Sequence, residues 1–168
     1  MPIVNEQTPT YDDYDLPKEV ELLKAALDER ELEVDPAFFG HVEKGDILEI
    51  YRFPEIKQIY CNSEFKKQSS YSDEQLKNMP FTQLYWRSDE NHLALIKRTS
   101  YVMENETGAV PWNLPVHELV ESLHPRKRTF EMKMRWIAPC FRKKTHEKVG
   151  FVTAHLALHI FEWDEDID

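Results

Sequence analysis

Residues 129–137 read Thr-Phe-Glu-Met-Lys-Met-Arg-Trp-Ile, a stretch in which apolar and charged side chains alternate. Successive side chains of a strand point to opposite faces of a sheet, so the apolar residues from Phe130 to Trp136 share one face. The charged residues between them share the other face. This stretch therefore predicts a β-strand that is buried on one side.

Residues 151–161, Phe-Val-Thr-Ala-His-Leu-Ala-Leu-His-Ile-Phe, predict a longer strand with two largely apolar faces. We expect the face from Val152 to Ile160 to pack beneath a helix. The opposite face, from Phe151 to Phe161, also carries two histidines and is too apolar to lie in water. It therefore needs a second cover.

Three further segments, near 47–53, 56–61 and 116–123, are short and rich in β-branched or aromatic residues, which favours strands. A long helix is predicted over 89–105, where Ser88 precedes two acidic residues in the first turn. The order of two strands, helices and then three strands predicts an α+β fold. We expect a five-stranded antiparallel sheet with the helices on one face.

Two polar residues mark the starts of short helices between these strands. Asn62 can accept a hydrogen bond from a free amide where the strand 56–61 becomes helix. Ser72 stands three residues before Gln75, the spacing of a capping box.

An amphipathic helix is predicted over 17–30, after an acidic arm and an N-cap at Asp15. Val20, Leu23 and Leu27 form its apolar stripe. A helix of this length is marginal in water unless it is packed. We expect it to cover the second apolar face of the last strand, either in its own chain or in a second copy.

Composition sets broad limits on organisation and function. The chain has 168 residues, a net charge of −10 and two cysteines. The length suits one domain (41–163), preceded by the arm and helix (1–40) and followed by an acidic tail (164–168). The acidity disfavours nucleic acid, and no apolar run reaches the ~20 residues of a membrane span. We expect a cytoplasmic protein without a signal peptide or a disulfide framework.

The stretches 59–65 (Ile-Tyr-Cys-Asn-Ser-Glu-Phe) and 70–76 (Ser-Tyr-Ser-Asp-Glu-Gln-Leu) resemble PAS domains, the sensory modules of many signalling proteins. They are similar to the family's second strand, its asparagine and the turn that follows, with Ser70 in place of the usual glycine. Gly150 resembles the glycine that opens the final PAS strand. The similarity covers about 42–163 and implies a PAS-like sheet.

The resemblance implies a PAS-type sensory module that binds a small ligand or a protein partner and relays binding through dimerisation or docking. A homodimer or a signalling partner protein is expected. Two alternatives stay open, namely a protein-interaction adaptor without a ligand, and a small α+β cavity protein that acts as a carrier or an enzyme. No catalytic motif stands out, so we expect no enzymatic activity.

The candidate residues fall into two sets. A ligand cavity between the sheet and the long helix would be lined by apolar side chains, namely Phe65, Tyr85, Trp86, Leu93, Ile96, Met132, Met134 and Trp136. The interface would use the amphipathic helix and the last strand, namely Val20, Leu23, Leu27, Phe151, His155, His159 and Phe161.

The sequence requires no cofactor, although haem or flavin remains possible through the resemblance. His92 lies on the helix from which haem-binding PAS relatives supply their axial ligand. His155 and His159 would lie about 13 Å apart along a strand at ~3.3 Å per residue, too far to share a metal ion. We therefore expect no metal site.

Overall fold

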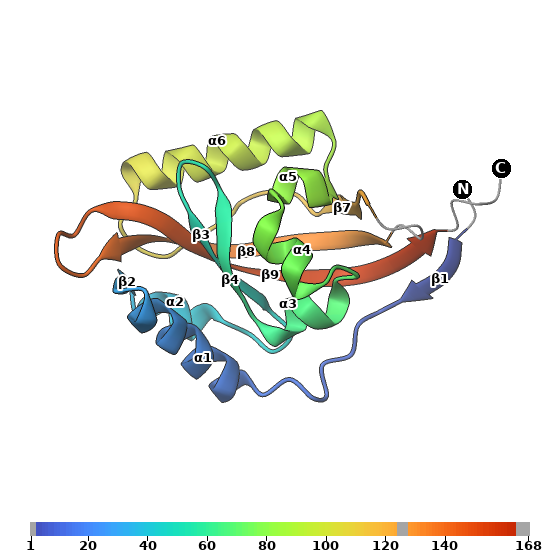
Figure 1. The fold of residues 1–168 in the computed structure, drawn as a ribbon, viewed down its shortest axis with the longest axis horizontal. Helices are drawn as coiled ribbons and strands as arrows, with labels where there is room; N and C mark the ends of the chain where they lie inside the picture. Colours follow the sequence, from blue (N-terminus) through green and yellow to red (C-terminus); the bar gives the residue numbers. More distant parts are fainter. Residues whose placement is uncertain (1–2, 124–127, 164–168) are drawn as a thin grey trace.

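The computed structural model describes residues 3–123 and 128–163, so the predicted acidic tail 164–168 lies outside the described residues. Nine strands form one antiparallel sheet that curls into a half-barrel (Figure 1). The strands are β1 (Ile3–Gln7), β2 (Leu32–Val34), β3 (Ile47–Arg52), β4 (Lys57–Cys61), β5 (Tyr85–Trp86), β6 (Val110–Pro111), β7 (His117–Glu121), β8 (Arg128–Arg142) and β9 (Lys148–Trp163).

The sheet is built around β8 and β9, its two longest strands. The main path runs β4-β3-β9-β8-β7-β5, while β1 pairs with β9, and β2 and β6 pair with β8. Gly150 allows β3 to approach β9 closely, because a Cβ atom there would lie 2.1 Å from the carbonyl oxygen of Tyr51. A side chain at this position would displace the β3 backbone.

The prediction of a five-stranded sheet with helices on one face is wrong. The five expected segments are strands and lie side by side, but four further short strands join them and helices cover both faces. The reason is the length of β8 and β9, which extend past the predicted limits of 137 and 161. Their overhanging ends have free backbone groups, and β2 pairs with residues 140–142 while β1 pairs with 160–163.

The helices are α1 (Leu16–Glu29), α2 (Ala37–His41), α3 (Ser63–Gln68), α4 (Asp73–Asn78), α5 (Phe81–Leu84) and α6 (Asp89–Asn105). The predicted caps are confirmed. Asp15, Asn62 and Ser88 each accept a hydrogen bond from a first-turn amide, and Ser72 forms the capping box with Gln75. None of the described helices is both long and apolar enough to cross a membrane.

Helices α1 and α2 cover one face of the sheet, which we call the closed face; α6 lies on the other side (Figure 1). On the closed face, Leu23 and Leu27 of α1 and Phe38 of α2 pack on the sheet. The sheet contributes small and branched residues there, among them Leu48, Ile50, Ala138, Cys140, Val152 and Ala154. The predicted helix 17–30 thus covers the sheet of its own chain.

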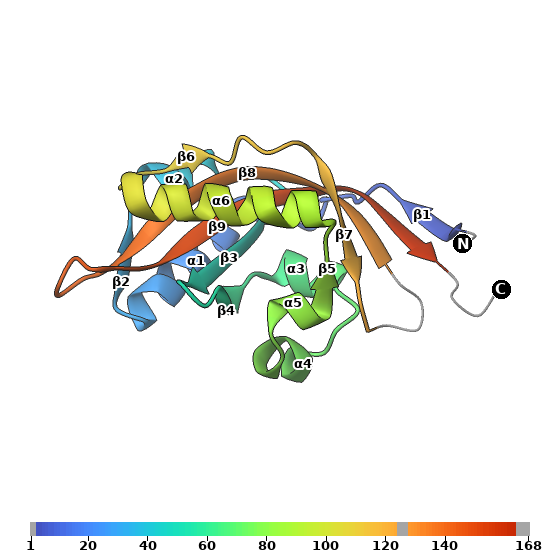
Figure 2. The same cartoon turned by 90° about the horizontal axis from the view of Figure 1, so that it is seen from above.

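The opposite face, which we call the cavity face, is covered by α3, α4, α5 and α6. Figure 2 shows α3, α4 and α5 grouped near β5, next to the start of α6. Two apolar clusters fill the ends of this face, one around Phe130 and Leu119 and one around Phe151 and Val102. The space between these clusters is not filled by side chains.

The structure reverses the predicted faces of the last strand near its start, whereas Ile160 packs in the cavity-face cluster around Phe130. Val152 and Ala154 lie on the closed face beneath α1, whereas Phe151 and His155 lie on the cavity face. The reason is chemical, because His155 pairs with a buried acid on the cavity face, and the closed face is packed with apolar side chains.

Candidate functional site

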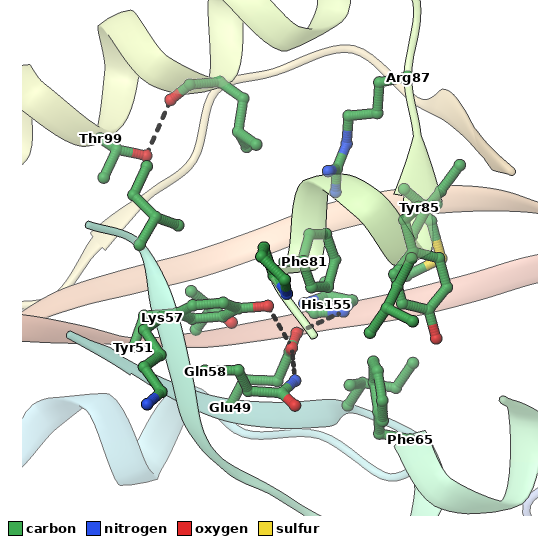
Figure 3. Close-up of a pocket in the computed structure, with 18 of the residues that line it drawn as sticks. Glu49, Tyr51, Lys57, Gln58, Phe65, Phe81, Tyr85, Arg87, Thr99 and His155 are labelled. Atoms are coloured by element: carbon green, nitrogen blue, oxygen red, sulfur yellow. Dashed lines mark hydrogen bonds and ion pairs between the residues drawn. The ribbon is translucent and has the colours of Figure 1, made fainter. Parts of the chain in front are cut away.

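A cavity of about 700 Å³ lies on the cavity face, between the sheet and helices α3 to α6 (Figure 3). Its floor comes from β3, β8 and β9, and its roof comes from α4, α5, α6 and the segment that joins β5 to α6. This volume falls within the roughly 300–1,000 Å³ of typical small-molecule sites. The fold therefore has room for an organic molecule of moderate size.

Most of the cavity wall is apolar and aromatic. The rings of Phe81 and Tyr85 stack with centroids 4.8 Å apart, and the rings of Tyr51 and Phe151 stack at 5.2 Å. Further apolar wall residues are Ile47, Phe65, Leu84, Leu119, Phe130, Met132 and Met134. Such walls favour a ligand that is itself largely apolar.

A buried acid–base pair forms part of the floor. Glu49 of β3 is 1% exposed, and its Oε1 lies 3.0 Å from Nε2 of His155 on the neighbouring strand β9. The Tyr51 hydroxyl and the Gln58 amide both donate to Oε2 of Glu49. Figure 3 shows these side chains meeting below Phe81. Both carboxyl oxygens of Glu49 are thus engaged.

Burial shifts the titration of this pair. Loss of water raises the pKa of Glu49 to about 7, although the hydrogen bonds from Tyr51 and Gln58 oppose the shift. Burial also lowers the pKa of His155 to about 3, and the positive charge of Arg87 lowers it further. Near neutral pH, His155 is therefore uncharged and Glu49 is partly protonated.

The protonation state of Glu49 determines whether Nδ1 of His155 is a hydrogen-bond donor or an acceptor. Oε2 of Glu49 already accepts two hydrogen bonds, so an added proton lies on Oε1 and is donated to Nε2. The His155 proton is then on Nδ1, which becomes a donor. When Glu49 is ionised, Nε2 carries the proton and Nδ1 becomes an acceptor.

Arg87 brings a cation to the cavity from the segment between β5 and α6. Its Nε donates to Nε2 of His117 over 3.0 Å, and Nδ1 of His117 lies 3.1 Å from the carbonyl oxygen of Pro115. A neutral His117 with its proton on Nδ1 satisfies both contacts, and burial lowers its pKa. Burial likewise lowers the pKa of Arg87.

Buried polar atoms without partners gather around the cavity. Among the described residues, five buried side-chain polar atoms have no hydrogen-bond partner. Four of them belong to residues that line the cavity, namely Gln68 Oε1, Trp112 Nε1, Thr153 Oγ1 and His155 Nδ1. Native proteins satisfy nearly all of their buried polar groups. These atoms are therefore exceptions, and they are concentrated in residues around the cavity.

The structure brings most of the predicted cavity residues together. Phe65, Tyr85, Trp86, Ile96, Met132 and Met134 line the cavity. Leu93 does not, because it points away from the buried stripe of α6 and is 53% exposed. Trp136 does not either, because a register shift in β8 after Met134 turns it to the other face, where it stacks on His41.

The predicted interface residues are dispersed. Leu23 and Leu27 are buried on the closed face of their own chain, with Val20 packed beside them. Phe151 is buried on the cavity face, and His155 lies in the cavity floor. His159 and Phe161 are half-buried, and Nδ1 of His159 lies 3.3 Å from Oγ1 of Thr8. These residues therefore do not form one outer face.

Sequence reasoning missed Glu49 and Arg87. Glu49 stands between Leu48 and Ile50 in an apolar strand, and an acid in such a strand is a signal for a buried functional group. Arg87 has no comparable signal, because it follows Trp86 in a short polar segment. Only the folded chain shows that it reaches the cavity.

The site shows no metal-ligand set. Among the residues that the structure describes, no three histidine, cysteine or acidic side chains come together. His92, which we considered as a haem ligand from the sequence, is exposed at the edge of the cavity. No protein-family model matches the sequence, and no curated protein matches it significantly.

Proposed function

We propose that the protein is a cytoplasmic sensory module that binds a small, largely apolar molecule in this cavity. The observation that carries the proposal is an apolar cavity of about 700 Å³ whose lining includes the Glu49–His155 pair and the guanidinium of Arg87. Specific small-molecule sites combine apolar walls with a few polar groups that orient the ligand. The resemblance of 59–65 and 70–76 to PAS domains supports a sensory role.

The surface beside the cavity supports a relay to a partner. Trp86 of β5 and Ile96 of α6 line the cavity and are also 55% and 36% exposed. Leu93, which is also on α6, is 53% exposed. A molecule in the cavity would contact side chains that also form an exposed apolar surface. We expect a signalling partner or a second copy of the chain to dock there. An adaptor without a ligand would use the same surface.

The Glu49–His155 pair favours a second candidate, an enzyme that moves a proton on its substrate. Glu49 titrates near pH 7, so its carboxylate can take up a proton that a substrate gives to Nδ1 of His155, because His155 passes its own proton from Nε2 to Glu49. The two candidates differ in the fate of the bound compound. A sensor releases it unchanged, whereas an enzyme converts it, and the variant His155→Gln would then stop the conversion.

The proposal can be tested with N-phenyl-1-naphthylamine, a neutral apolar fluorophore that brightens when it leaves water. We expect it to bind the folded protein at one site. The variant Thr99→Phe places a ring in the cavity from α6, where Thr99 is 2% exposed, and should weaken binding at least tenfold. Leu93→Phe changes the same helix outside the cavity and should leave binding unchanged.

Equal binding to the wild type and Thr99→Phe, or no saturable binding to the wild type, would contradict the proposal. A denaturation curve for each variant shows whether it is folded. If Thr99→Phe does not fold, Ile96→Trp narrows the mouth of the cavity from the exposed side and serves the same purpose.

A further inference from the structure

We infer that the ligand of the cavity is a hydrophobic carboxylate whose head group pairs with Arg87 while its chain lies along the apolar wall. This inference rests on the proposed function, because it assigns a chemical class to the molecule in the same cavity. Its basis is an arginine that enters the cavity with most of its hydrogen-bonding capacity unused.

Arg87 is half-buried and lines the cavity. Figure 3 shows its side chain extending from the segment between β5 and α6 toward the cavity, above Phe81. Its Nε donates to His117, but Nη1 and Nη2 have no hydrogen-bond partner among the described residues. These two nitrogens are not among the buried atoms without partners, so a molecule in the cavity can reach them.

Within residues 3–123 and 128–163, the Arg87 guanidinium has no ion-paired counterion. No carboxylate of the described residues forms an ion pair with Arg87. Glu49 is the buried acid of the same cavity, but its oxygens are taken by His155, Tyr51 and Gln58. The other acids that line the cavity, Glu55 and Asp89, are exposed. The binding site therefore has a place for an anion that comes with the ligand.

A carboxylate fits this place in both charge and geometry. The guanidinium is a planar fork whose two parallel N–H groups match the two oxygens of a carboxylate. The Phe81 ring lies under the fork, 5.7 Å from the guanidinium carbon, and helps to hold its plane. One head group can thus take both free nitrogens at once.

The remaining charges near the head group permit an anion. Burial raises the pKa of Glu49 to about 7, so this carboxyl group repels an anion less than an ordinary carboxylate does. His117 donates from Nδ1 to Pro115 and accepts from Arg87, so it is neutral and adds no charge beside the guanidinium.

The rest of the ligand is expected to be apolar, because most side chains of the cavity wall are apolar. Phe65, Leu119, Phe130 and Met132 form a continuous buried cluster along the floor and one end of the cavity. Displacing water from such a wall by hydrocarbon is favourable, at roughly 25 cal/mol per Å² of apolar area. A carboxylate with a medium-length chain or an aromatic ring satisfies both parts of the site.

The test compares decanoate with 1-decanol by calorimetric titration, since the two differ in the head group alone. We expect the wild type to bind decanoate at least tenfold more tightly than 1-decanol at pH 7. Arg87→Met should remove this difference by weakening decanoate binding at least tenfold while leaving 1-decanol binding unchanged. Arg52→Met changes an exposed arginine at the end of β3 and should alter neither.

The outcomes separate the inference from the function on which it rests. Equal affinity of the wild type for both compounds, or unchanged decanoate binding in Arg87→Met, overturns the carboxylate assignment and leaves the cavity as a binding site. No binding of either compound, together with no binding of the neutral fluorophore, overturns both. Retained 1-decanol binding in Arg87→Met shows that the cavity of the variant is intact, and Arg87→Lys should recover part of the decanoate affinity.

Discussion

The two faces of the central strands are packed in opposite ways, although they alternate along the same residues. On β3, Leu48 and Ile50 are fully buried on the closed face, whereas Glu49 between them points into the cavity. On β9, Val152 and Ala154 face α1, and Thr153 between them faces the cavity. The closed face is an apolar core, whereas four of the five buried polar atoms without partners among the described residues belong to residues that line the cavity.

This difference separates stability from binding. A tightly packed apolar face supplies most of the free energy of folding. A face that leaves space and partnerless polar groups lowers stability, unless a ligand completes it. The stability supplied by the closed face therefore offsets the cost of the cavity. Substitutions on the two faces should change the free energy of unfolding by different amounts and in different directions.

The largest effect is expected on the closed face. Leu23 of α1 is completely buried, so Leu23→Ala removes packed methyl groups and leaves a cavity. We expect it to lower the free energy of unfolding by about 3 kcal/mol. Leu22→Ala is the matched control, because Leu22 is 45% exposed on the same helix. Urea denaturation measures both; similar midpoints for the two variants would show that α1 does not pack as described.

A smaller loss is expected where a buried polar group is fully satisfied. Asn62 is 1% exposed, its side chain accepts from the amide of Phe65, and its Nδ2 donates to the carbonyl oxygen of Asp46. Asn62→Ala removes a cap and a buried hydrogen bond, which should cost about 2 kcal/mol. Ser72→Ala removes an exposed cap alone and should cost less. An unchanged denaturation midpoint for Asn62→Ala would refute this role.

The opposite sign is expected where a buried polar group has no partner. Thr153 is 2% exposed, and its hydroxyl has no partner among the described residues. Thr153→Val keeps the shape and removes the hydroxyl, so it should raise the free energy of unfolding by about 1 kcal/mol. Thr99→Val should bring no such gain, because the Thr99 hydroxyl donates to Leu95. A loss of stability in Thr153→Val would mean that the hydroxyl is satisfied in solution.

The smallest effect is a pH dependence of stability from the Glu49–His155 pair. Glu49 titrates near pH 7 when folded and near 4.5 when unfolded, so its contribution to stability is present at low pH and is lost as the pH rises through 7. His155 titrates near 3 when folded and near 6.5 when unfolded, so its contribution is lost as the pH falls. The two oppose each other between these limits.

The net result is a small decrease in the free energy of unfolding between pH 6.5 and 8. Glu49 causes this decrease, and His155 does not cancel it because His155 is already neutral in both states over most of this range. The groups that face Glu49 and act on its charge are His155 on β9, Tyr51 on β3, Cys61 on β4, Tyr85 on β5 and Arg87 before α6. Subtracting the curve of Glu49→Gln from that of the wild type isolates the effect. A flat difference across this range would mean that Glu49 titrates elsewhere.

Local signals in the sequence predicted local structure well. Asn62, Ser72 and Ser88 begin helices as expected, because a cap acts on amides within three residues of it. The alternation around Phe130 and the apolar run from Phe151 gave the two long strands, because the period of two is a property of the backbone.

Features that depend on distant pairing were not predictable in the same way. The strands β1, β2, β5 and β6 have two to five residues each and form only because β7, β8 or β9 offers a free edge. Trp136 lies on the closed face and not in the cavity, because of a register shift in β8 after Met134. The alternation of apolar and charged residues does not reveal such a shift. The predicted homodimer is untested by a single chain and stays a prediction.

Methionine methyl groups offer the most direct test of the claim that the cavity binds a ligand. Met79, Met132 and Met134 line the cavity, whereas Met103 is buried outside it. In protein with ¹³C-labelled methionine methyl groups, titration with decanoate should shift the three cavity signals along one saturation curve and leave the Met103 signal in place. Cavity signals that do not move while decanoate binds, or a Met103 signal that moves alone, would contradict the account.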